Sequence, residues 1–202
     1  MKSWSFFGGP TSLPYRLFDH VRVRVNRFLV AYLLGSAIDN HGSRVLEAGS
    51  GPAYASSLLS KSEKVSLSVA VDIDIEALRE AKNRDPQLPA VVADLYSLPF
   101  AAETFDLVWN SSTIEHLGRP DVALAEMRRV TCRDGCVFVG VPYRRGPLGF
   151  QRWIANTSAG VWIGRVFGKE ELRISVEKLG LRPVDTKPYF FRFFIGMLAR
   201  RA

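Results

Sequence analysis

Cysteine, histidine and long apolar runs are scarce in this chain, and each shortage argues against a class of protein. Cys132 and Cys136 are the only cysteines in 202 residues, and no Cys/His cluster surrounds them, which argues against a disulfide framework and a zinc site. The three histidines, His20, His41 and His116, are too scattered to form a metal set, so we expect no metal. No run approaches the ~20 apolar residues of a membrane span. A reducing, cytoplasmic location fits this pattern best.

Acidic side chains are scarce toward both ends of the chain. Residues 1–40 carry five basic and two acidic side chains, residues 41–140 carry ten and fourteen, and residues 141–202 carry twelve and four. Both flanks are therefore basic, whereas the middle is mildly acidic. This asymmetry indicates an anionic substrate, a nucleic acid or a membrane surface near the flanks, and arginines that simply face water are the alternative.

Short apolar runs alternate with amphipathic stretches through the middle of the chain. The runs predict strands over residues 44–48, 65–71, 90–93, 105–109 and 136–141, and the stretches between them predict helices over residues 52–61, 75–82 and 121–130. Strands separated by helices are typical of an α/β fold, with a parallel sheet and helices on both faces.

The two ends follow other patterns. After an irregular lead-in over residues 1–15, apolar spacings of three and four predict one or two helices over residues 16–38, closed by Asn40-His41-Gly42. Residues 143–167 are rich in Gly, Arg and aromatic residues and have no clean period. A helix over residues 169–179, ended by Gly180, precedes two strands over residues 181–189 and 191–199, which we expect to form an antiparallel pair at one sheet edge.

The turn after the first predicted strand is the strongest local sign of a ligand site. It contains Gly49 and Gly51, separated by Ser50, and leads into a predicted helix. Glycine has no Cβ atom, so the backbone can adopt a positive φ and a ligand can lie against it. Free amide groups and a partial positive charge at the start of the helix favour the same use. A tight connection without a ligand is the alternative.

Polar side chains end the other predicted strands. Asp72 follows the second strand, Asp94 the third and Asn110 the fourth, while Glu47 lies near the end of the first. Ligands bind at the carboxyl ends of the strands of such a sheet. An acid after the second strand can accept hydrogen bonds from a ribose diol, and an acid after the third can accept one from the amine of adenine. With the glycine turn, these residues predict an adenosine-containing cofactor.

The chain resembles the class I S-adenosylmethionine-dependent methyltransferases of the type 11 domain family. The matching segments lie in the family's order between residues 44 and 142, at residues 45–51, 71–74, 93–95, 98–100, 105–108, 114–117, 126–130 and 135–142. The resemblance implies a Rossmann-like, seven-stranded, mostly parallel sheet with helices on both faces and an antiparallel C-terminal strand. It also implies one domain over residues 1–202, with an N-terminal helical cap (1–42), a cofactor-binding core (43–142) and a C-terminal part (143–202) that holds a lid segment, a helix and the closing strand pair.

The resemblance implies S-adenosyl-L-methionine as the cofactor and a role for five residues around its methionine end. Gly49, Ser50 and Gly51 would pass under the methionine part, with Glu47 beside the amino group. Asn110 would lie next to the sulfonium. As an alternative, Glu47 could pair with a basic neighbour.

At the other end of the cofactor, the resemblance implies contacts with the nucleoside. Asp72 would hold the ribose hydroxyls, and Ile73 would pack on the adenine. Asp94 would accept a hydrogen bond from the adenine amine, with the Leu95 amide nearby. The alternatives are that Asp94 caps the following turn and that Ile73 is an ordinary core residue.

Chemistry at such a site needs little beyond placement of an acceptor in line with the sulfonium methyl. A base is needed only if the acceptor loses a proton during attack. His116 is the sole histidine near the expected site and is the candidate base. A purely structural role, in which Glu115 and His116 orient the loop after the fourth strand, is the stronger alternative.

Other functions remain open at this point. A dinucleotide oxidoreductase is disfavoured because Pro52-Ala53-Tyr54 follows Gly51 where that fingerprint needs a third glycine. A catalytically inactive cofactor-binding subunit or sensor is an alternative, and a nucleic-acid-binding module that uses the basic flanks is a second, although no known binding motif supports it. The residues after Asn110 also differ from those of the nucleic-acid methyltransferases that act on exocyclic amines, which argues against methylation of a base amine.

The acceptor is not identified by the sequence. In the resembling family it is recognised by the N-terminal helices and by the segment after the fifth strand, which are the two basic flanks here. Arginines among aromatic residues in residues 143–168 favour a small-molecule acceptor that is anionic or lipid-like, with weak peripheral membrane contact. Ordinary packing with solvated arginines is the alternative.

Overall fold

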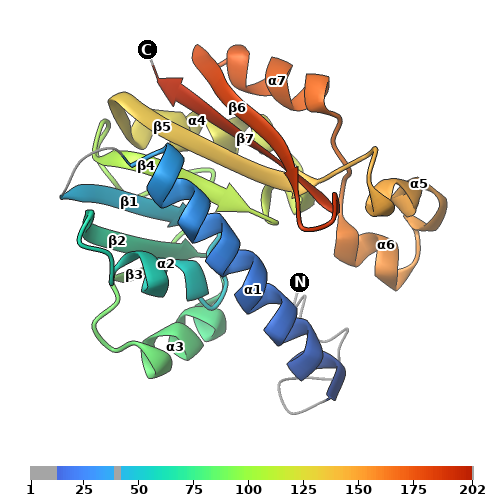
Figure 1. Cartoon of the computed structure of the whole chain (residues 1–202), viewed down its shortest axis with the longest axis horizontal. Coiled ribbons are helices and arrows are strands. Elements are labelled where there is room, and N and C mark those ends of the chain that lie inside the picture. Colours follow the sequence, from blue (N-terminus) through green and yellow to red (C-terminus); the bar gives the residue numbers. More distant parts are fainter. Residues whose placement is uncertain (1–12, 39–41, 202) are drawn as a thin grey trace.

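The computed structural model describes residues 13–38 and 42–201, and its strands form a single seven-stranded sheet. The strands are β1 (Ser43–Ala48), β2 (Val65–Asp72), β3 (Ala90–Val92), β4 (Phe105–Ser111), β5 (Thr131–Pro142), β6 (Leu181–Tyr189) and β7 (Phe194–Arg201). They lie in the order β3–β2–β1–β4–β5–β7–β6 (Figure 1). β7 runs antiparallel to β5 and β6, and the other pairs are parallel. The predicted fold class is confirmed.

Helices cover both faces of this sheet. They are α1 (Leu13–Ser36), α2 (Tyr54–Leu59), α3 (Ile75–Arg84), α4 (Pro120–Val130), α5 (Gln151–Ile154), α6 (Ser158–Ile163) and α7 (Lys169–Glu177), with 3-10 turns η2 (Ile114–His116) and η3 (Pro147–Phe150). Buried clusters place α1, α2 and α3 on one face and α4 and α7 on the other. No helix within the described ranges combines the length and apolar character needed to cross a membrane.

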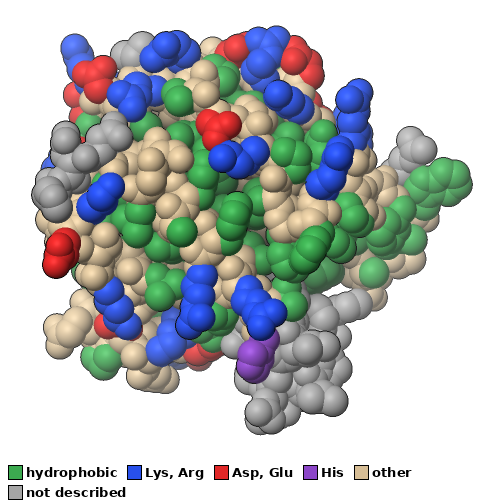
Figure 2. All heavy atoms as spheres, in the orientation of Figure 1, with side chains coloured by type: hydrophobic (Ala, Val, Ile, Leu, Met, Phe, Trp, Pro, Cys, Tyr) green, Lys and Arg blue, Asp and Glu red, His purple; other side chains and the backbone are tan. Residues whose placement is uncertain are grey.

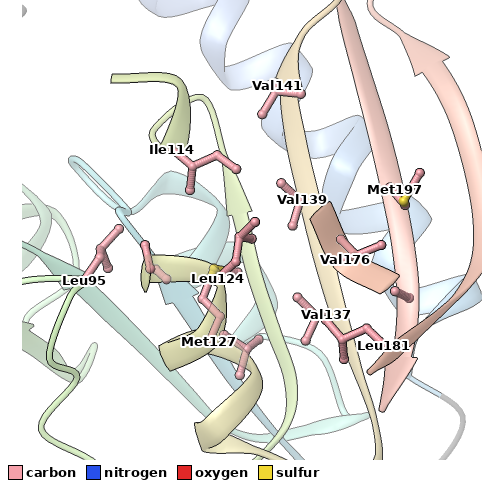
Figure 3. Packing of buried hydrophobic residues seen from close by; sticks show 14 of the residues in the cluster. Leu95, Ile114, Leu124, Met127, Val137, Val139, Val141, Val176, Leu181 and Met197 are labelled. Carbon is pink, nitrogen blue, oxygen red and sulfur yellow. The ribbon is translucent and has the colours of Figure 1, made fainter. Parts of the chain in front are cut away.

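The two faces follow from the alternation of side chains along each strand. Val45 of β1 packs with the cluster under α1 and α2, while its neighbour Leu46 packs with the cluster under α4 and α7. Figure 3 shows the cluster under α4 and α7, in which Val176 of α7 lies close to Val137 and Val139 of β5, and Met127 of α4 lies next to Leu124. Because central strands are apolar on both faces, they read as continuous apolar runs in the sequence.

The register of the central strands brings their carboxyl ends to one level. Glu47 of β1 lies beside Ala70 of β2 and Trp109 of β4. Asp72, two residues after Ala70, ends β2, and Asn110, one residue after Trp109, lies one residue before the end of β4, so both lie next to the turn that follows β1. The sheet thus gathers the predicted polar residues at one edge.

The N-terminal helix begins earlier than predicted. α1 starts at Leu13 and runs unbroken to Ser36, so residues 13–15 are helical rather than part of an irregular lead-in. Pro14 is compatible with this because the first helical turn needs no intrahelical hydrogen bond from its N–H groups. The rest of the predicted lead-in and the turn residues Asn40 and His41 lie outside the described residues.

Two further boundaries differ from the prediction for local reasons. α2 begins at Tyr54 rather than at residue 52, because Ala53 has a left-handed backbone (φ 52°) that a helix cannot include. β5 begins at Thr131 rather than at residue 136. Residues 131–135, which lie between a predicted helix and a predicted strand, instead form the start of β5, with a left-handed Asp134 (φ 62°) where the pairing with β4 shifts register.

The connection between the last two strands is longer than predicted. β7 begins at Phe194, whereas the sequence predicts a start at residue 191. Phe190, Phe191 and Arg192 all have left-handed backbones, with φ of 46°, 51° and 65°. Three such residues in a row form a turn rather than a strand. Aromatic residues resemble strand residues in a sequence pattern, which explains the error.

Candidate functional site

The turn after β1 has the left-handed backbone that its glycines predict. Gly49 and Gly51 have φ of 79° and 52°, and Ala53 also has a positive φ. The turn is fastened to the end of β2, because the amides of Gly49 and Ser50 both donate to the Val71 carbonyl, at 2.8 and 2.9 Å. The backbone therefore bends sharply at the carboxyl edge of the sheet.

Gly49 also lies against a second segment. A Cβ atom on Gly49 would lie 2.5 Å from Cγ2 and 2.6 Å from Oγ1 of Thr113. The Thr113 hydroxyl in turn donates to the Gly49 carbonyl at 3.0 Å. Both the backbone angle and the close approach require glycine here, and the contact joins the turn to the loop between β4 and η2.

Asp72 at the end of β2 holds the same turn from the other side. Its Oδ2 accepts from the Gly51 amide at 2.6 Å, and its Oδ1 accepts from the Asp74 amide at 2.9 Å. The sequence predicts free amides at the start of the helix. Instead, the Gly51 amide donates to Asp72 and the Ser56 amide donates to Glu47. Each carboxylate oxygen of Asp72 still has a lone pair for a ligand.

Glu47 points into the protein below the turn. It is buried, and its Oε2 accepts from the Ser56 amide at 2.9 Å and from the Ser56 hydroxyl. Burial raises the pKa of the Glu47 carboxyl to about 8, although the Ser56 hydrogen bonds act in the opposite direction. The alternative in which Glu47 pairs with a basic neighbour is not what the structure shows, because Ser56 is its hydrogen-bond partner.

Asn110 lies beside the turn at the end of β4. The side chain is fully buried, and its Nδ2 donates to the Ala48 carbonyl. Its Oδ1 has no hydrogen-bond partner among the described residues. A buried acceptor without a donor costs free energy, and a cationic or N–H-bearing ligand would relieve that cost.

The nucleoside end of the predicted site is exposed. The Ile73 side chain is 70% exposed, so it is not an ordinary core residue, and an aromatic ring could cover it. Asp94 is exposed as well. Its Oδ1 accepts from the Tyr96 amide at 2.9 Å, so Asp94 caps the turn that follows it. The Leu95 side chain is buried in the core beside Ile114 (Figure 3).

Glu115 and His116 lie under the segment between α6 and α7. A Cβ atom on Gly164 would lie 2.7 Å from His116 Nδ1 and 2.9 Å from Glu115 Cγ, and the Arg165 amide donates to the Glu115 carbonyl at 3.1 Å. The Glu115 side chain is buried, and its Oε2 has no partner within the described part of the chain. Burial raises the pKa of Glu115 to about 8.

His116 differs from its neighbour because it is exposed on one side. Packing on the other side, against Gly164, desolvates the ring and lowers the pKa of His116 below its ordinary value. The imidazole is therefore neutral at pH 7, as a proton acceptor must be. Its location under the segment that follows β5 is compatible with contact to an acceptor.

We expect the protonation of Glu115 to make stability depend on pH. Its pKa is about 8 in the folded protein against an ordinary 4.5, so the folded state holds the proton more tightly and unfolding becomes easier as the pH rises. The free energy of unfolding should fall by up to about 1.4 kcal/mol per pH unit across this range for each such group. In the Glu115→Gln variant, the free energy of unfolding should decrease less steeply with pH. The variant should therefore be more stable than the natural chain at about pH 8 but not at about pH 5. Urea denaturation at both pH values measures this, and parallel curves would contradict it.

Most of the predicted site residues meet at the edge formed by β1, β2 and β4, whereas Asp94 lies beyond β3 and His116 lies under the segment between α6 and α7. Thr113 and Gly164 were missed, because each matters only through a contact with a segment distant in the sequence. Among the residues described, no group of three or more His, Cys, Asp or Glu side chains is placed to hold a metal ion.

Comparisons with known proteins point to one family. A family model described as a methyltransferase domain matches residues 46–139. A malonyl-[acyl-carrier protein] O-methyltransferase from Laribacter hongkongensis is 37% identical over 106 residues, which is 46% of this chain and 35% of that protein. A demethylmenaquinone methyltransferase from Renibacterium salmoninarum is 38% identical over 71 residues, or 35% of this chain and 30% of that protein. The chain spans about a third of the length of the curated relatives it matches.

A solved structure covers more of the chain. A S-adenosylmethionine-dependent methyltransferase from Thermotoga maritima has a TM-score of 0.70 with 20% sequence identity, over 92% of this chain and 96% of that one. At this identity the likeness shows the fold alone. It covers more of the chain than the family model, which matches residues 46–139.

Proposed function

Because the chain belongs to the class I S-adenosyl-L-methionine-dependent methyltransferase family, we propose that it transfers a methyl group from this cofactor to a small-molecule or lipid-like acceptor. The observation that supports this best is the left-handed turn at Gly49–Gly51, level with Asp72 and Asn110 at one sheet edge. When bound, the cofactor supplies an electrophilic methyl on a sulfonium, so alignment of the acceptor provides most of the catalysis.

The residues at this edge fit the methionine part of the cofactor. In our proposal, the main chain of Gly49, Ser50 and Gly51 lies under it, because the left-handed glycines bend the turn sharply at the sheet edge and carry no side chain. The unpartnered Oδ1 of Asn110 faces a donor or a positive charge, which the cofactor has in its ammonium and sulfonium groups. Glu47 supports the turn from below through Ser56 and lies nearest the amino group.

The rim fits the nucleoside part. We propose that Asp72 accepts hydrogen bonds from the ribose hydroxyls with its remaining lone pairs, while the exposed Ile73 packs on the adenine. Asp94 and the Leu95 amide would contact the adenine edge. The division into a cap (1–42), a cofactor-binding core (43–142) and a C-terminal part (143–202) belongs to the same proposal. The stacking of Arg22 of α1 over the Tyr54 ring, 4.8 Å from its centroid, supports it because it brings the cap next to the turn.

The acceptor is proposed only as a class. The two relatives named above differ in the acceptor that their names give, and the arginines in both flanks favour an anionic group. A cytoplasmic location is part of this proposal, supported by Cys132 and Cys136, which are both thiols in the structure.

Calorimetry with S-adenosylmethionine and S-adenosylhomocysteine tests the cofactor, and transfer of an isotopic methyl group into fractionated cell extract tests the reaction. We expect binding of both compounds and a labelled product. Binding without any product would favour the inactive subunit or sensor. No binding of either compound would overturn the proposal and leave the nucleic-acid-binding module to be tested.

His116→Ala tests whether this residue is the base. If it accepts the acceptor's proton, turnover should fall by about 10²-fold or more while cofactor affinity stays unchanged, since general bases contribute of that order. His116→Gln is the matched control because it keeps a polar group of similar reach but cannot take up a proton at pH 7. Full turnover in the alanine variant would leave His116 with a structural role.

A further inference from the structure

Exposed aromatic side chains and exposed arginines gather at one end of the molecule. Phe191 is 84% exposed and Trp153 is 78% exposed, while Phe28 and Phe150 are each 50% exposed. We call these residues, together with four exposed arginines, the docking face; the arginines are Arg24, Arg27, Arg145 and Arg192. Single exposed aromatic residues are common on protein surfaces, but a group of four is not.

Three segments that are distant in the sequence build this face. Phe28 of α1 stacks on Tyr189 at the end of β6, with ring centroids 6.4 Å apart. Phe193, just after the β6–β7 turn, packs with Leu148 of η3 and the α6 region. Figure 1 shows the β6–β7 turn next to α5 and α6, with α1 passing on its other side. α1 therefore packs at the end of β6, and η3 and α6 pack against the β6–β7 turn, so the segments that carry the face are neighbours.

The β6–β7 turn, in the middle of the face, has an unusual backbone conformation. Phe190, Phe191 and Arg192 are all left-handed, which is unfavourable for side chains of this size. A Cβ atom on Gly146 would lie 1.8 Å from the Arg192 carbonyl oxygen, and the Tyr143 amide donates to the Phe193 carbonyl at 2.9 Å. The lid segment thus fixes the turn in a conformation that presents Phe191 to solvent.

The charges around these aromatic residues have one sign. Residues 144–168 and 189–194 contain five arginines and no Asp or Glu. Arg144 and Arg165 are both bound by Glu171 of α7 and so are not part of the face. The four arginines of the face have no acidic partner among the described residues. Figure 2 shows hydrophobic atoms on the right of the molecule with Lys and Arg nearby and no Asp or Glu among them.

We propose that the docking face binds the surface of a bilayer that contains anionic phospholipids. Rigid aromatic side chains favour the boundary between headgroups and acyl chains, and arginines next to them reach the phosphates. The combination favours a bilayer over a nucleic acid, which would use the arginines but would leave Phe191 and Trp153 in water. The inference goes beyond methyl transfer, and binding to vesicles needs neither cofactor nor acceptor.

Flotation with vesicles of phosphatidylcholine, with and without about one-third phosphatidylglycerol, measures the binding. We expect binding to the anionic vesicles that weakens as salt is raised, and little binding to the neutral ones. Replacing the four arginines of the face by glutamine should lower the partition coefficient by about five-fold per arginine. The matched control replaces four exposed basic residues elsewhere by glutamine, namely Lys61, Arg79, Arg133 and Arg182, and should lose much less.

The aromatic contribution is tested separately with Trp153→Ser/Phe191→Asn. Asparagine tolerates a left-handed backbone, so this variant should fold as well as the natural chain. We expect it to lose at least about ten-fold in binding. Its control, Ile174→Ser/Val184→Ser, removes two exposed apolar side chains from α7 and β6 and should bind normally.

A fluorescence measurement reports which residue enters the bilayer. Brominated lipid should quench the natural chain more than Trp153→Phe, which keeps an aromatic ring but removes the fluorophore. The proposal is overturned if the natural chain does not bind the vesicles, or if the face variants and the control variants lose the same amount of binding. It is also overturned if the protein binds DNA and the substitutions Trp153→Ser/Phe191→Asn leave that DNA binding unchanged. None of the substituted residues is placed at the cofactor site, so these variants should bind S-adenosylmethionine normally in calorimetry. Failure here is therefore distinguishable from failure of the proposed function.

Discussion

Replacing Gly49 by alanine should abolish cofactor binding and lower the free energy of unfolding by about 2–4 kcal/mol. The residue has φ of 79°, which costs about 1–2 kcal/mol for any side chain. The new Cβ atom would also overlap Thr113, at 2.5 and 2.6 Å from its Cγ2 and Oγ1, so either the turn or the loop after β4 must move. Urea denaturation measures the first effect and calorimetry with S-adenosylmethionine the second.

The control for this prediction is Gly42→Ala. Gly42 has a similar φ of 87°, but nothing lies within 4 Å of a Cβ atom placed there. The Gly42→Ala variant should therefore lose only the free energy that the left-handed backbone angle costs, about 1–2 kcal/mol, and keep its cofactor affinity. A second variant, Gly49→Ala/Thr113→Ala, removes the two closest atoms and should regain part of the lost stability. Equal behaviour of Gly42→Ala and Gly49→Ala would show that the contact with Thr113 is unimportant.

The sheet could be predicted from the sequence because its signals are local. Val45 and Leu46 face opposite helical layers, so both are apolar, and the central strands appear as unbroken apolar runs. The polar residue that follows each apolar run marks the carboxyl end of the strand to within about one residue. Asp72 and Asn110 were located in this way, and the parallel register then brought them to one edge.

The contacts that complete the site could not be predicted, because they depend on residues far apart in the sequence. Nothing near Thr113 indicates that it touches Gly49, 64 residues away. Gly164 resembles any loop glycine, yet its missing Cβ leaves room for His116 and Glu115. Glu47 could be located from its place near the end of the first predicted strand, but its raised pKa could not be predicted. That pKa comes from burial, which the hydrogen bonds from Ser56 oppose, and only the folded chain supplies both.

The β6–β7 turn shows a different reason for error. Residues 189–194 are almost entirely aromatic, which is typical of strands, and this composition predicts a strand from residue 191. The backbone there is instead left-handed, and residues 143–146, just after β5, pack against it. An aromatic residue in an exposed turn, such as Phe191, and an aromatic residue in a strand, such as Phe194, look alike in a sequence, so the pattern alone could not separate them.

Asp72→Ala should lower the affinities for S-adenosylmethionine and S-adenosylhomocysteine by the same factor, about 10² or more. The two compounds share the ribose that we propose Asp72 binds, and each hydrogen bond to a charged group contributes about 1.5–3 kcal/mol. The variant also leaves the Gly51 and Asp74 amides without their acceptor, at a cost in stability of about 1–2 kcal/mol. Calorimetry with both compounds measures the affinities.

Asp74→Ala separates the loss of a ribose contact from general damage to this edge. Asp74 caps α3 by accepting from the Glu76 and Ala77 amides, so its removal should cost about 1 kcal/mol of stability. Its backbone amide still donates to Asp72, and the cofactor affinity should therefore be unchanged. If Asp74→Ala lowered the affinities for both compounds as much as Asp72→Ala does, the loss of affinity would come from damage to the loop after β2. If Asp72→Ala lowered only the affinity for S-adenosylmethionine, the role of Asp72 would lie near the sulfonium and not at the ribose.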